Sequence, residues 1–176
     1  MILENDGIRL RAVEPEDLEL LYLWENDETN WRQSNTLVPY SRYILKKYIA
    51  GSRKSIYETG QLRLMIEVLP GERTIGTIDL YDFDHYHKRA GVGILIADPA
   101  DRKRGYASAA LTCLISYAFD TLGLHQLWCN ILDNNSESKH LFTGHGFVIC
   151  GSRKEWIRVT GGYETEHLLQ LINKQK

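Results

Sequence analysis

The sequence predicts an α/β fold with a mixed sheet, and two patterns of apolar residues carry this prediction. Leu62, Leu64, Ile66 and Val68 alternate with the residues between them, which indicates a strand with two different faces. From Gly105 the apolar period changes to 3.6 residues and is maintained as far as Leu122, which indicates a long amphipathic helix. Because helical segments lie among strands along the chain, we expect helices packed on a sheet.

The N-terminal third should contain one short strand and two helices. The strand is expected at 8–11. Glu14-Pro15 then begins a helix, because proline at the first helical position removes only a donor that has no partner there. This helix should end near Asn26-Asp27, before a polar, irregular stretch through Asn30, Trp31 and Asn35. Ser41 can then cap a second helix whose apolar residues share one face.

The remaining elements supply most of the sheet. After a turn at Pro70-Gly71, a strand at 74–80 should pair antiparallel with one at 89–96 through a turn at 82–88. The helix that begins at Gly105 is then followed by a buried strand at 126–132 and a short helix at 136–144. A final pair of strands is expected at 147–159 and 165–172.

Bulk properties limit the classes of protein. The chain has 176 residues, 43% of them hydrophobic and 25% charged, so we expect a single domain over residues 1–176. The net charge is −2 and the basic residues are dispersed, which argues against a nucleic-acid partner. The N-terminus lacks the pattern of a signal peptide, and no apolar run approaches the roughly 20 residues of a membrane span. We therefore expect a cytoplasmic protein with no membrane partner.

The cysteines and histidines do not form a metal-binding pattern. Cys113, Cys129 and Cys150 are far apart and lie in apolar segments, so we expect buried thiols rather than metal ligands or a nucleophile. His85 and His87 stand beside acidic residues, but no further group completes a ligand set. A charged hairpin turn is the better interpretation, and we expect no metal site.

The junction between the strand ending near Ile96 and the helix from Gly105 is the first candidate site. Pro99 ends the strand, and three basic residues, Arg102 to Arg104, precede the glycine. Such a junction directs backbone N–H groups and the positive end of a helix dipole at one point, which suits a pyrophosphate. Taken alone, the pattern fits a solvated basic loop equally well.

A second segment, 135–147, gives this junction a context. Together the two segments resemble the motifs of the GNAT acetyltransferases. The loop motif Q/R-x-x-G-x-G/A is matched by Arg102, Gly105 and Ala107. The motif N-x-x-S/A-x-x-L/I-Y-x-x-x-G-F is matched by Asn135, Ser138, Leu141, Gly146 and Phe147. The segments 8–18, 76–79 and 87–90 also resemble the RimJ/RimL and spermidine acetyltransferase branch, so the resemblance covers nearly the whole chain.

The resemblance implies a GNAT fold, with a mixed, mostly antiparallel sheet that splays and about four flanking helices. It implies transfer of an acetyl group from acetyl-CoA to a primary amine, and direct attack is expected because no Cys or Ser is placed to carry the acyl group. Backbone groups of Ile94 and Ile96 should meet the pantetheine, and an N–H near Leu95 should polarise the thioester carbonyl. Asn135 should hydrogen-bond the pantetheine arm, and Ser138 should also bind the cofactor. The phosphates should be held by Arg102, Lys103, Arg104, Gly105, Tyr106, Ala107 and Ser108.

Two positions depart from the family pattern. Spermidine acetyltransferases carry a Glu at the position of Gly91, so an acid often assigned to amine deprotonation is missing. Gly91 and Gly93 leave one face of their strand bare, which indicates either close packing or a widened acceptor pocket. Phe142 stands where many relatives have a Tyr that protonates the departing thiolate. That loss is tolerable, because a thiol of pKa about 8.5 leaves readily.

The missing Glu bears on the identity of the acceptor. At pH 7 a polyamine nitrogen of pKa about 10.4 is roughly 0.04% neutral, whereas an N-terminal amine is roughly 10 to 17% neutral. The missing Glu therefore favours an α-amine as the acceptor, unless another residue serves as the base. Asp79 is the best remaining candidate for handling the amine, as a base through water or as an anionic anchor. Tyr81, Asp82 and His85 are alternatives. The residues expected to line the acceptor site are Glu25, Asn26, Trp31, Tyr81 and Gly91.

Several alternatives remain open at this point. The acceptor is a polyamine or another small amine, or else the N-terminal amine of a peptide or protein. Each acidic or aromatic residue of the acceptor region is equally compatible with a solvated helix end. A catalytically silent acyl-CoA-binding regulatory domain is the alternative function. Relatives are often dimers or larger, so a homodimer or higher homo-oligomer stands beside a monomer as an open alternative.

Overall fold

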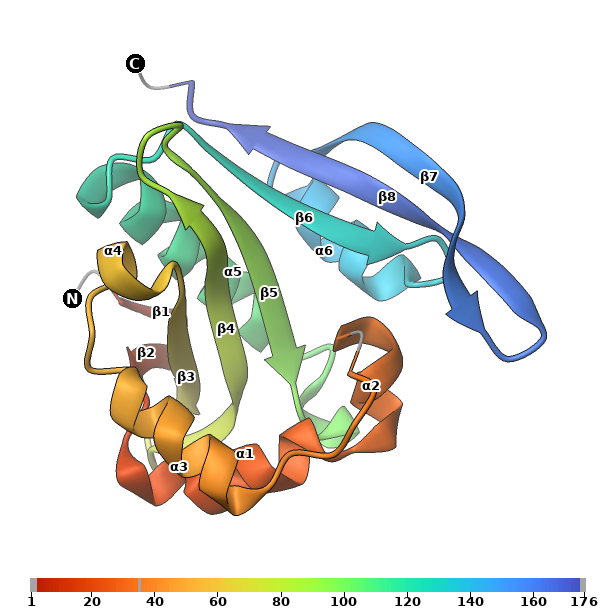
Figure 1. The fold of residues 1–176 in the computed structure, drawn as a ribbon. Coiled ribbons are helices and arrows are strands. Elements are labelled where there is room, and N and C mark those ends of the chain that lie inside the picture. The colour runs from red at the N-terminus through yellow and green to blue at the C-terminus, as the bar shows by residue number, and fades with distance from the viewer. Residues whose placement is uncertain (1–2, 35, 175–176) are drawn as a thin grey trace.

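One sheet forms the frame of the molecule. In the computed structural model, which describes residues 3–34 and 36–174, eight strands lie in the order β1-β2-β3-β4-β5-β6-β8-β7 (Figure 1). Neighbouring strands are antiparallel except β5 and β6, which are parallel. The strands are β1 (Glu4–Asn5), β2 (Ile8–Ala12), β3 (Leu62–Val68), β4 (Arg73–Asp84), β5 (Arg89–Ile96), β6 (Gln126–Leu132), β7 (Val148–Val159) and β8 (Gly162–Ile172).

The parallel pair is where the sheet splays. β5 and β6 are paired only from Arg89 to Gly91 on β5 and from Gln126 to Trp128 on β6. Beyond this point the two strands run apart, and β6 carries β8 and β7 away with it (Figure 1). The mixed, splayed sheet predicted from the sequence is therefore confirmed.

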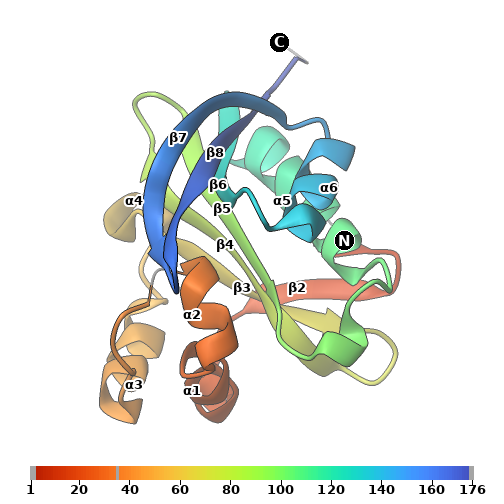
Figure 2. The same ribbon diagram turned by 90° about the vertical axis from the view of Figure 1, so that its right-hand side faces the viewer.

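Helices cover both faces of the sheet. Figures 1 and 2 show α5 and α6 on one face and α1, α2 and α3 on the other. The helices are α1 (Leu18–Glu25), α2 (Glu28–Ser34), α3 (Arg42–Gly51), α4 (Ile56–Thr59), α5 (Tyr106–Ser116) and α6 (Ser136–Gly144). Short turns of other helical types are η1 (Pro15–Asp17), η2 (Pro99–Asp101) and η3 (Tyr117–Thr121), and η3 prolongs α5 as a π-turn. Within the described residues no helix is both long enough and apolar enough to cross a bilayer.

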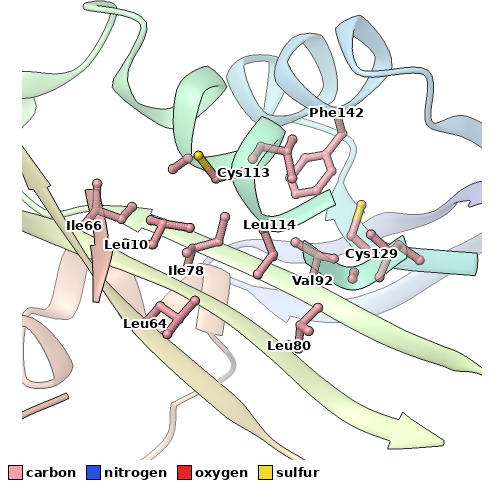
Figure 3. Close-up of a cluster of buried hydrophobic side chains, with 14 of the residues drawn as sticks. Leu10, Leu64, Ile66, Ile78, Leu80, Val92, Cys113, Leu114, Cys129 and Phe142 are labelled. Carbon is pink, nitrogen blue, oxygen red and sulfur yellow. The ribbon is translucent and has the colours of Figure 1, made fainter. Parts of the chain in front are cut away.

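Alternation along the strands divides the core into two layers. Leu64 and Ile66 of β3 belong to the larger cluster, together with Leu114 of α5 (Figure 3). Met65, which lies between them in sequence, belongs to the other cluster, with Leu21 of α1 and Leu45 of α3. Because successive side chains of a strand point to opposite faces, one strand anchors both helical layers.

Two helices were missed by the sequence analysis. The stretch predicted to be irregular contains α2, which Asp27 precedes: its carboxylate accepts hydrogen bonds from the amide and the hydroxyl of Thr29. The four residues of α4 lie between Ser55, whose hydroxyl accepts from the amide of Tyr57, and Gly60 in the left-handed conformation. Both are short and their caps were overlooked, so the described residues hold six α-helices where about four were expected. Asn35 lies outside the described residues.

The two-residue strand β1 was also missed, and the remaining elements were located correctly, with differences at their ends. The hydroxyl of Ser41 caps α3, as predicted, by accepting from the amide of Ile44. The strand expected to end at Leu80 runs on to Asp84, and the last strand begins at Gly162. The long helix ends as regular α-helix at Ser116, and the π-turn carries the chain toward Leu122.

Candidate active site

The splayed strands enclose a cavity of about 550 Å³. Its walls are contributed by α1, α2, β3, β4, β5, β6, α6 and β8, with several loop residues. Many residues predicted for the site line this one cavity, namely Glu25, Asp79, Tyr81, Ile94, Leu95, Asn135, Ser138 and Phe142. The structure therefore brings candidate cofactor and acceptor residues together around the point where β5 and β6 separate.

The backbone of β5 presents alternate residues to this gap. The amide of Ala97 donates to the carbonyl of Ile75 on β4 at 2.9 Å, so the backbone groups of Ala97 face β4. The carbonyl of Leu95 also lies against β4, because it would be 1.9 Å from a Cβ atom placed on Gly76. Since N–H and C=O directions alternate along a strand, Ile94 and Ile96 present theirs to the gap. The amide of Leu95 points away from the cavity and cannot act as the predicted oxyanion donor.

The loop after β5 ends in a helix N-terminus. Gly105 is the N-cap of α5 at φ +84°, and no other part of the protein lies within 4 Å of where a Cβ atom would sit. The bond from the Ala109 amide to the Gly105 carbonyl, at 2.9 Å, is the first of the helix. The amides of Tyr106, Ala107 and Ser108 therefore have no acceptor within the helix. Such a start, with open space above a glycine, fits a bound pyrophosphate.

The three basic residues before Gly105 differ in their contacts. The Arg102 guanidinium donates to the Ile96 carbonyl at 3.2 Å and ties the loop to the end of β5. This bond uses one of the backbone groups that Ile96 directs at the gap. Lys103 forms an exposed ion pair with Glu137 of α6 at 3.2 Å. Arg104 is exposed. All three carry positive charge beside the helix start.

The first turn of α6 closes the cavity from the opposite side. The side-chain oxygen of Asn135 caps this helix by accepting from the Ser138 amide at 3.0 Å. Asn135 and Ser138 thus support each other where both line the cavity. Phe142, one turn further along, is 3% exposed and packs edge-on against Phe147, with ring centroids 5.0 Å apart.

A charged cluster forms the opposite wall. The Arg63 guanidinium donates to both carboxylate oxygens of Asp79, each at 2.8 Å, and also to Glu25. Burial opposes the charged form of Arg63, but the neighbouring Asp79 carboxylate outweighs it and raises the Arg63 pKa well above its usual value. Burial also raises the pKa of Tyr48, whose ring lies near this guanidinium, to about 12. Arg63, which the sequence analysis did not single out, is therefore a fixed cation that holds two acids of the cavity.

Comparison with known proteins agrees with this geometry. Residues 8–148, most of the chain, match the family model described as an acetyltransferase (GNAT) domain. The chain belongs to the GNAT acetyltransferase family. It is 25% identical to spermidine N(1)-acetyltransferase of Escherichia coli K12 over 160 residues, which cover 89% of this chain and 81% of that protein.

Solved structures share the fold. Spermidine N-acetyltransferase from Vibrio cholerae in complex with CoA and spermine superposes with a TM-score of 0.86 at 23% identity, over 96% of both chains. The dodecameric structure of the Vibrio cholerae enzyme gives a TM-score of 0.79 at 22% identity, over 98% of this chain and all of that one. The GNAT fold and the acetyltransferase class predicted from the sequence are confirmed.

The bare glycine face of this GNAT enzyme is not an empty pocket. A Cβ atom on Gly91 would lie 2.4 Å from the Tyr81 ring, so that ring occupies the space over the glycine. Tyr81 also packs edge-on against Trp128 of β6, with ring centroids 5.2 Å apart. The widened acceptor pocket suggested at Gly91 is therefore wrong: Gly91 is buried beneath Tyr81, which takes the room that a strand Glu would need. Burial raises the pKa of Tyr81, which keeps its hydroxyl protonated.

Two predicted acceptor residues serve the scaffold instead. The Asn26 amide group donates to the carbonyls of Tyr22 and Tyr40, and its oxygen accepts from the Tyr40 amide. These bonds hold the segment before α3 against α1. The Trp31 indole donates to the Glu25 carbonyl at 2.8 Å and so packs α2 against the end of α1. Neither residue is among those that line the cavity.

Cys113 and Cys129 are buried thiols as predicted, whereas Cys150 is exposed, so the prediction of burial is wrong for that residue. The thiols fit a reaction without a covalent acyl-enzyme. Cys129 lines the cavity, but burial raises its pKa to about 12, so it stays a thiol rather than a nucleophilic thiolate. Among residues 3–34 and 36–174 no cluster of three or more His, Cys, Asp or Glu could hold a metal ion. The residues that the sequence analysis missed, besides Arg63, are Trp128 and Glu166. Arg63, Trp128 and Glu166 lie on different strands, and which side chains of these strands face the cavity is known only from the strand register.

Proposed function

We propose that this GNAT enzyme acetylates a primary amine that carries further positive charge, as polyamines do, with acetyl-CoA as acetyl donor. The observation that supports it most is the charge of the cavity wall. Glu25 and Asp79 contribute two negative charges against the single buried cation Arg63, and Asp82 adds another. An ammonium group is the natural complement of such a surplus. The spermidine acetyltransferase relative is consistent with this acceptor class.

Aromatic residues strengthen the case for a cationic acceptor. Trp24, Tyr40, Tyr81 and Trp128 line the same cavity as the acids. Aromatic faces attract ammonium groups, and the attraction grows when water is excluded. A peptide N-terminus carries only one cation and gains less from this wall. We therefore favour a polyamine-like amine over a peptide acceptor.

Different residues bind acetyl-CoA, stabilise the oxyanion and anchor the acceptor amine in the proposed reaction. Acetyl-CoA supplies an acetyl group already activated as a thioester. The amides of Tyr106, Ala107 and Ser108 hold the pyrophosphate, with Arg102, Lys103 and Arg104 adding charge. The amide of Ile94, on the gap side of β5, takes the oxyanion role first assigned to Leu95. Asp79 and Glu25, fixed by Arg63, anchor the acceptor for direct attack by its free amine.

Gly105→Asp tests the donor site. The new side chain and its negative charge would lie against the pyrophosphate, so the Kd for acetyl-CoA should rise at least tenfold, a loss of about 1.4 kcal/mol. Gly161→Asp is the matched control, because Gly161 also has a positive φ and open space around it but lies in the β7–β8 turn. Equal affinity of both folded variants in titration calorimetry would remove the phosphate site from this loop.

A panel of amines tests the acceptor. Thiol release from acetyl-CoA would be measured with polyamines, monoamines, amino acids, aminoglycosides and N-terminal peptides. We expect kcat/KM to be highest for amines with two or more cations, and higher than for monoamines of the same pKa. Preference for N-terminal peptides would overturn the acceptor assignment. Tight acetyl-CoA binding without turnover of any amine would favour the regulatory domain instead.

We also propose a domain organisation, an oligomeric state and a cellular location for the protein. The continuous sheet, which takes strands from both ends of the chain, supports a single catalytic domain over residues 1–176. The dodecameric Vibrio cholerae structure and the exposed apolar side chains Val148, Ile149 and Trp156 on β7 support a homo-oligomer. Light scattering on the purified protein would give its mass. Free thiols at Cys113, Cys129 and Cys150 are consistent with a reducing compartment such as the cytoplasm.

A further inference from the structure

A buried carboxylate from the last strand reaches the cavity. Glu166 of β8 lies opposite Leu132 of β6 and opposite Arg153 of β7. It is 6% exposed and lines the same cavity as Asp79 and Tyr81. Acidic residues are disfavoured in strands and are seldom buried without a partner or a task. Its position in the cavity wall therefore calls for a chemical explanation.

The two oxygens of Glu166 have different surroundings. Oε2 accepts a hydrogen bond from the Arg153 guanidinium. Oε1 has no hydrogen-bond partner in the described part of the chain. The described atoms that lack a partner and are also shielded from solvent do not include Oε1. Oε1 is therefore accessible to solvent. Because Glu166 is buried except where it lines the cavity, this oxygen faces the space that an acceptor would occupy.

The other acids of the cavity are less suited to accept a proton. Both oxygens of Asp79 are bound by Arg63, which also holds Glu25 and is only 15% exposed, so this cation cannot move away. Arg153 is 44% exposed and lies 4.8 Å from the Trp156 ring, so it can turn to solvent when Glu166 becomes neutral. A protonated Glu166 would thus leave no buried charge behind.

Tyr81 links Glu166 to the strand that lacks its acid. The Tyr81 ring covers Gly91, the position at which the family resemblance implies a Glu. Burial is the main reason why the Tyr81 pKa is raised, and the negative charge of Glu166 is near enough to contribute. The carboxylate and the phenol both line the cavity between the splayed strands. Glu166 on β8 can therefore supply the acid that the family resemblance places at Gly91 on β5.

We propose that Glu166 is the catalytic base that takes the proton from the acceptor's ammonium group. The inference rests on the acetyltransferase function proposed above. One N–H bond of the ammonium breaks and an O–H bond forms on Oε1, which frees the nitrogen lone pair. The nitrogen then forms a bond to the acetyl carbon, the carbon–sulfur bond breaks, and a second nitrogen proton accompanies the thiol. Glu166 finally releases its proton to solvent, so each turnover yields one amide, one thiol and one proton.

Glu166→Gln tests this role, because it keeps the shape and removes the basic oxygen. At pH 7 we expect kcat/KM for spermidine to fall about a hundredfold, within the usual range for a lost general base. A short peptide with an N-terminal amine of pKa about 8 should lose less than about threefold, since roughly 9% of it is already neutral at pH 7, against roughly 0.04% of a polyamine nitrogen. The loss with spermidine should shrink as the pH rises toward 9.5. The Kd for acetyl-CoA, measured by calorimetry, should not change.

Arg153→Gln is the matched control. It breaks the same ion pair but leaves the carboxylate, so kcat/KM should stay within about threefold of wild type for both acceptors. If the two variants lose the same factor with every acceptor, Glu166 only holds the β7–β8 hairpin and the proposal is wrong. If Glu166→Gln does not fold, Glu166→Asp keeps the charge and should retain the wild-type shape of the pH profile at reduced rate. A pH profile for Glu166→Asp that rises steadily toward the amine pKa would also overturn the assignment. Failure of the proposed function is a separate result, because wild-type protein would then release no thiol with any amine.

Discussion

Two charged clusters on the same face of the sheet show how similar ion pairs serve different ends. Arg63 and Glu67 stand two residues to either side of the buried Met65 on β3, and all three point to one face. Around Glu67, Arg11 bridges to Asp17 at 2.7 Å and Arg9 adds a second cation at 2.7 Å. Two arginines thus balance two buried acids. The cluster around Arg63 has one arginine for two acids and opens into the cavity.

The difference between the clusters is the balance of charge. The Arg11 cluster is closed: its guanidinium also donates to the Ala12 carbonyl and the Thr74 hydroxyl, so its donors are used within the protein. It can contribute to stability but has no surplus charge to offer a ligand. The Arg63 cluster keeps one uncompensated negative charge beside solvent. We infer that the first cluster holds η1 against the sheet and that the second recognises a cationic substrate.

The largest effect is expected from Arg11→Met, which breaks the closed cluster. Asp17 is 3% exposed and would lose the only cation that pairs with it among the described residues, while Glu67 would keep Arg9. Leaving a buried carboxylate without its partner costs about 3 kcal/mol, so Tm should fall by roughly 6 to 12 °C. The exposed pair of Arg42 with Glu19 is the control, and Arg42→Met should cost less than about 1 kcal/mol. Calorimetric melts of the two variants would separate these outcomes.

The same variant should change how stability depends on pH. Burial opposes ionisation of Asp17, but the hydrogen bonds from Arg11 outweigh it and lower the Asp17 pKa. A lowered pKa contributes stability above the usual carboxyl range, and this contribution is lost as the pH falls through the folded value. Wild-type Tm should therefore hold until the pH falls below about 4, and the decline in Arg11→Met should begin at higher pH. If Tm falls in the same way for wild type and Arg11→Met as the pH is lowered, the cluster contributes nothing to the pH dependence of stability.

Gly91→Glu should have the next largest effect, because it places a further acid in the cavity wall. The new Cβ atom would lie 2.4 Å from the Tyr81 ring, which must leave its place against Trp128. We expect a loss of about 1 to 3 kcal/mol in stability and at least a tenfold loss of kcat/KM. The double variant Gly91→Glu/Tyr81→Val removes the obstruction and should recover both quantities. Recovery of neither would mean that Tyr81 is not the reason why this position is glycine.

These clusters also mark the limit of what the sequence could predict. Alternation at 62–68 and the helical period after Gly105 located the main elements, and the spacing of Gly105, Asn135 and Gly146 indicated the cofactor side. The ion pair between Arg63 and Asp79 depends on the antiparallel register of β3 and β4, which no local pattern in the sequence determines. The place of Tyr81 over Gly91 and the reach of Glu166 into the cavity depend on three more pairings. Sequence signals were strong where the proposed function uses backbone groups and a helix start, and weak where it uses side chains from distant strands.

Asp79→Asn should have a smaller effect, confined to acceptor binding. Both Asp79 oxygens are held by Arg63, which favours an anionic anchor over a base for this residue. Removing one negative charge makes the cluster neutral, because Glu25 alone then balances Arg63. We expect KM for polyamines to rise about tenfold, with kcat within about threefold and acetyl-CoA affinity unchanged. Added salt should narrow the gap to wild type, because screening weakens the same attraction. A fall in kcat at saturating amine would instead return Asp79 to the role of base.

Phe142→Tyr should have the smallest effect, because it adds a neutral group to the cavity and leaves both clusters unchanged. Phe142 is 3% exposed and packs edge-on against Phe147, so the new hydroxyl must either reach the cavity or stay buried without a partner. A hydroxyl that reaches the cavity would offer a general acid to the departing thiolate, yet a thiol of pKa about 8.5 leaves readily at neutral pH. We therefore expect kcat within about threefold of wild type and a pH profile of unchanged shape. A buried hydroxyl would lower Tm by a few degrees without altering kcat, so melting curves measured beside the rates distinguish the two placements. A hundredfold fall in kcat of the folded variant would show that Phe142 shapes the cavity by packing, and that the chemistry there is not governed by charge alone.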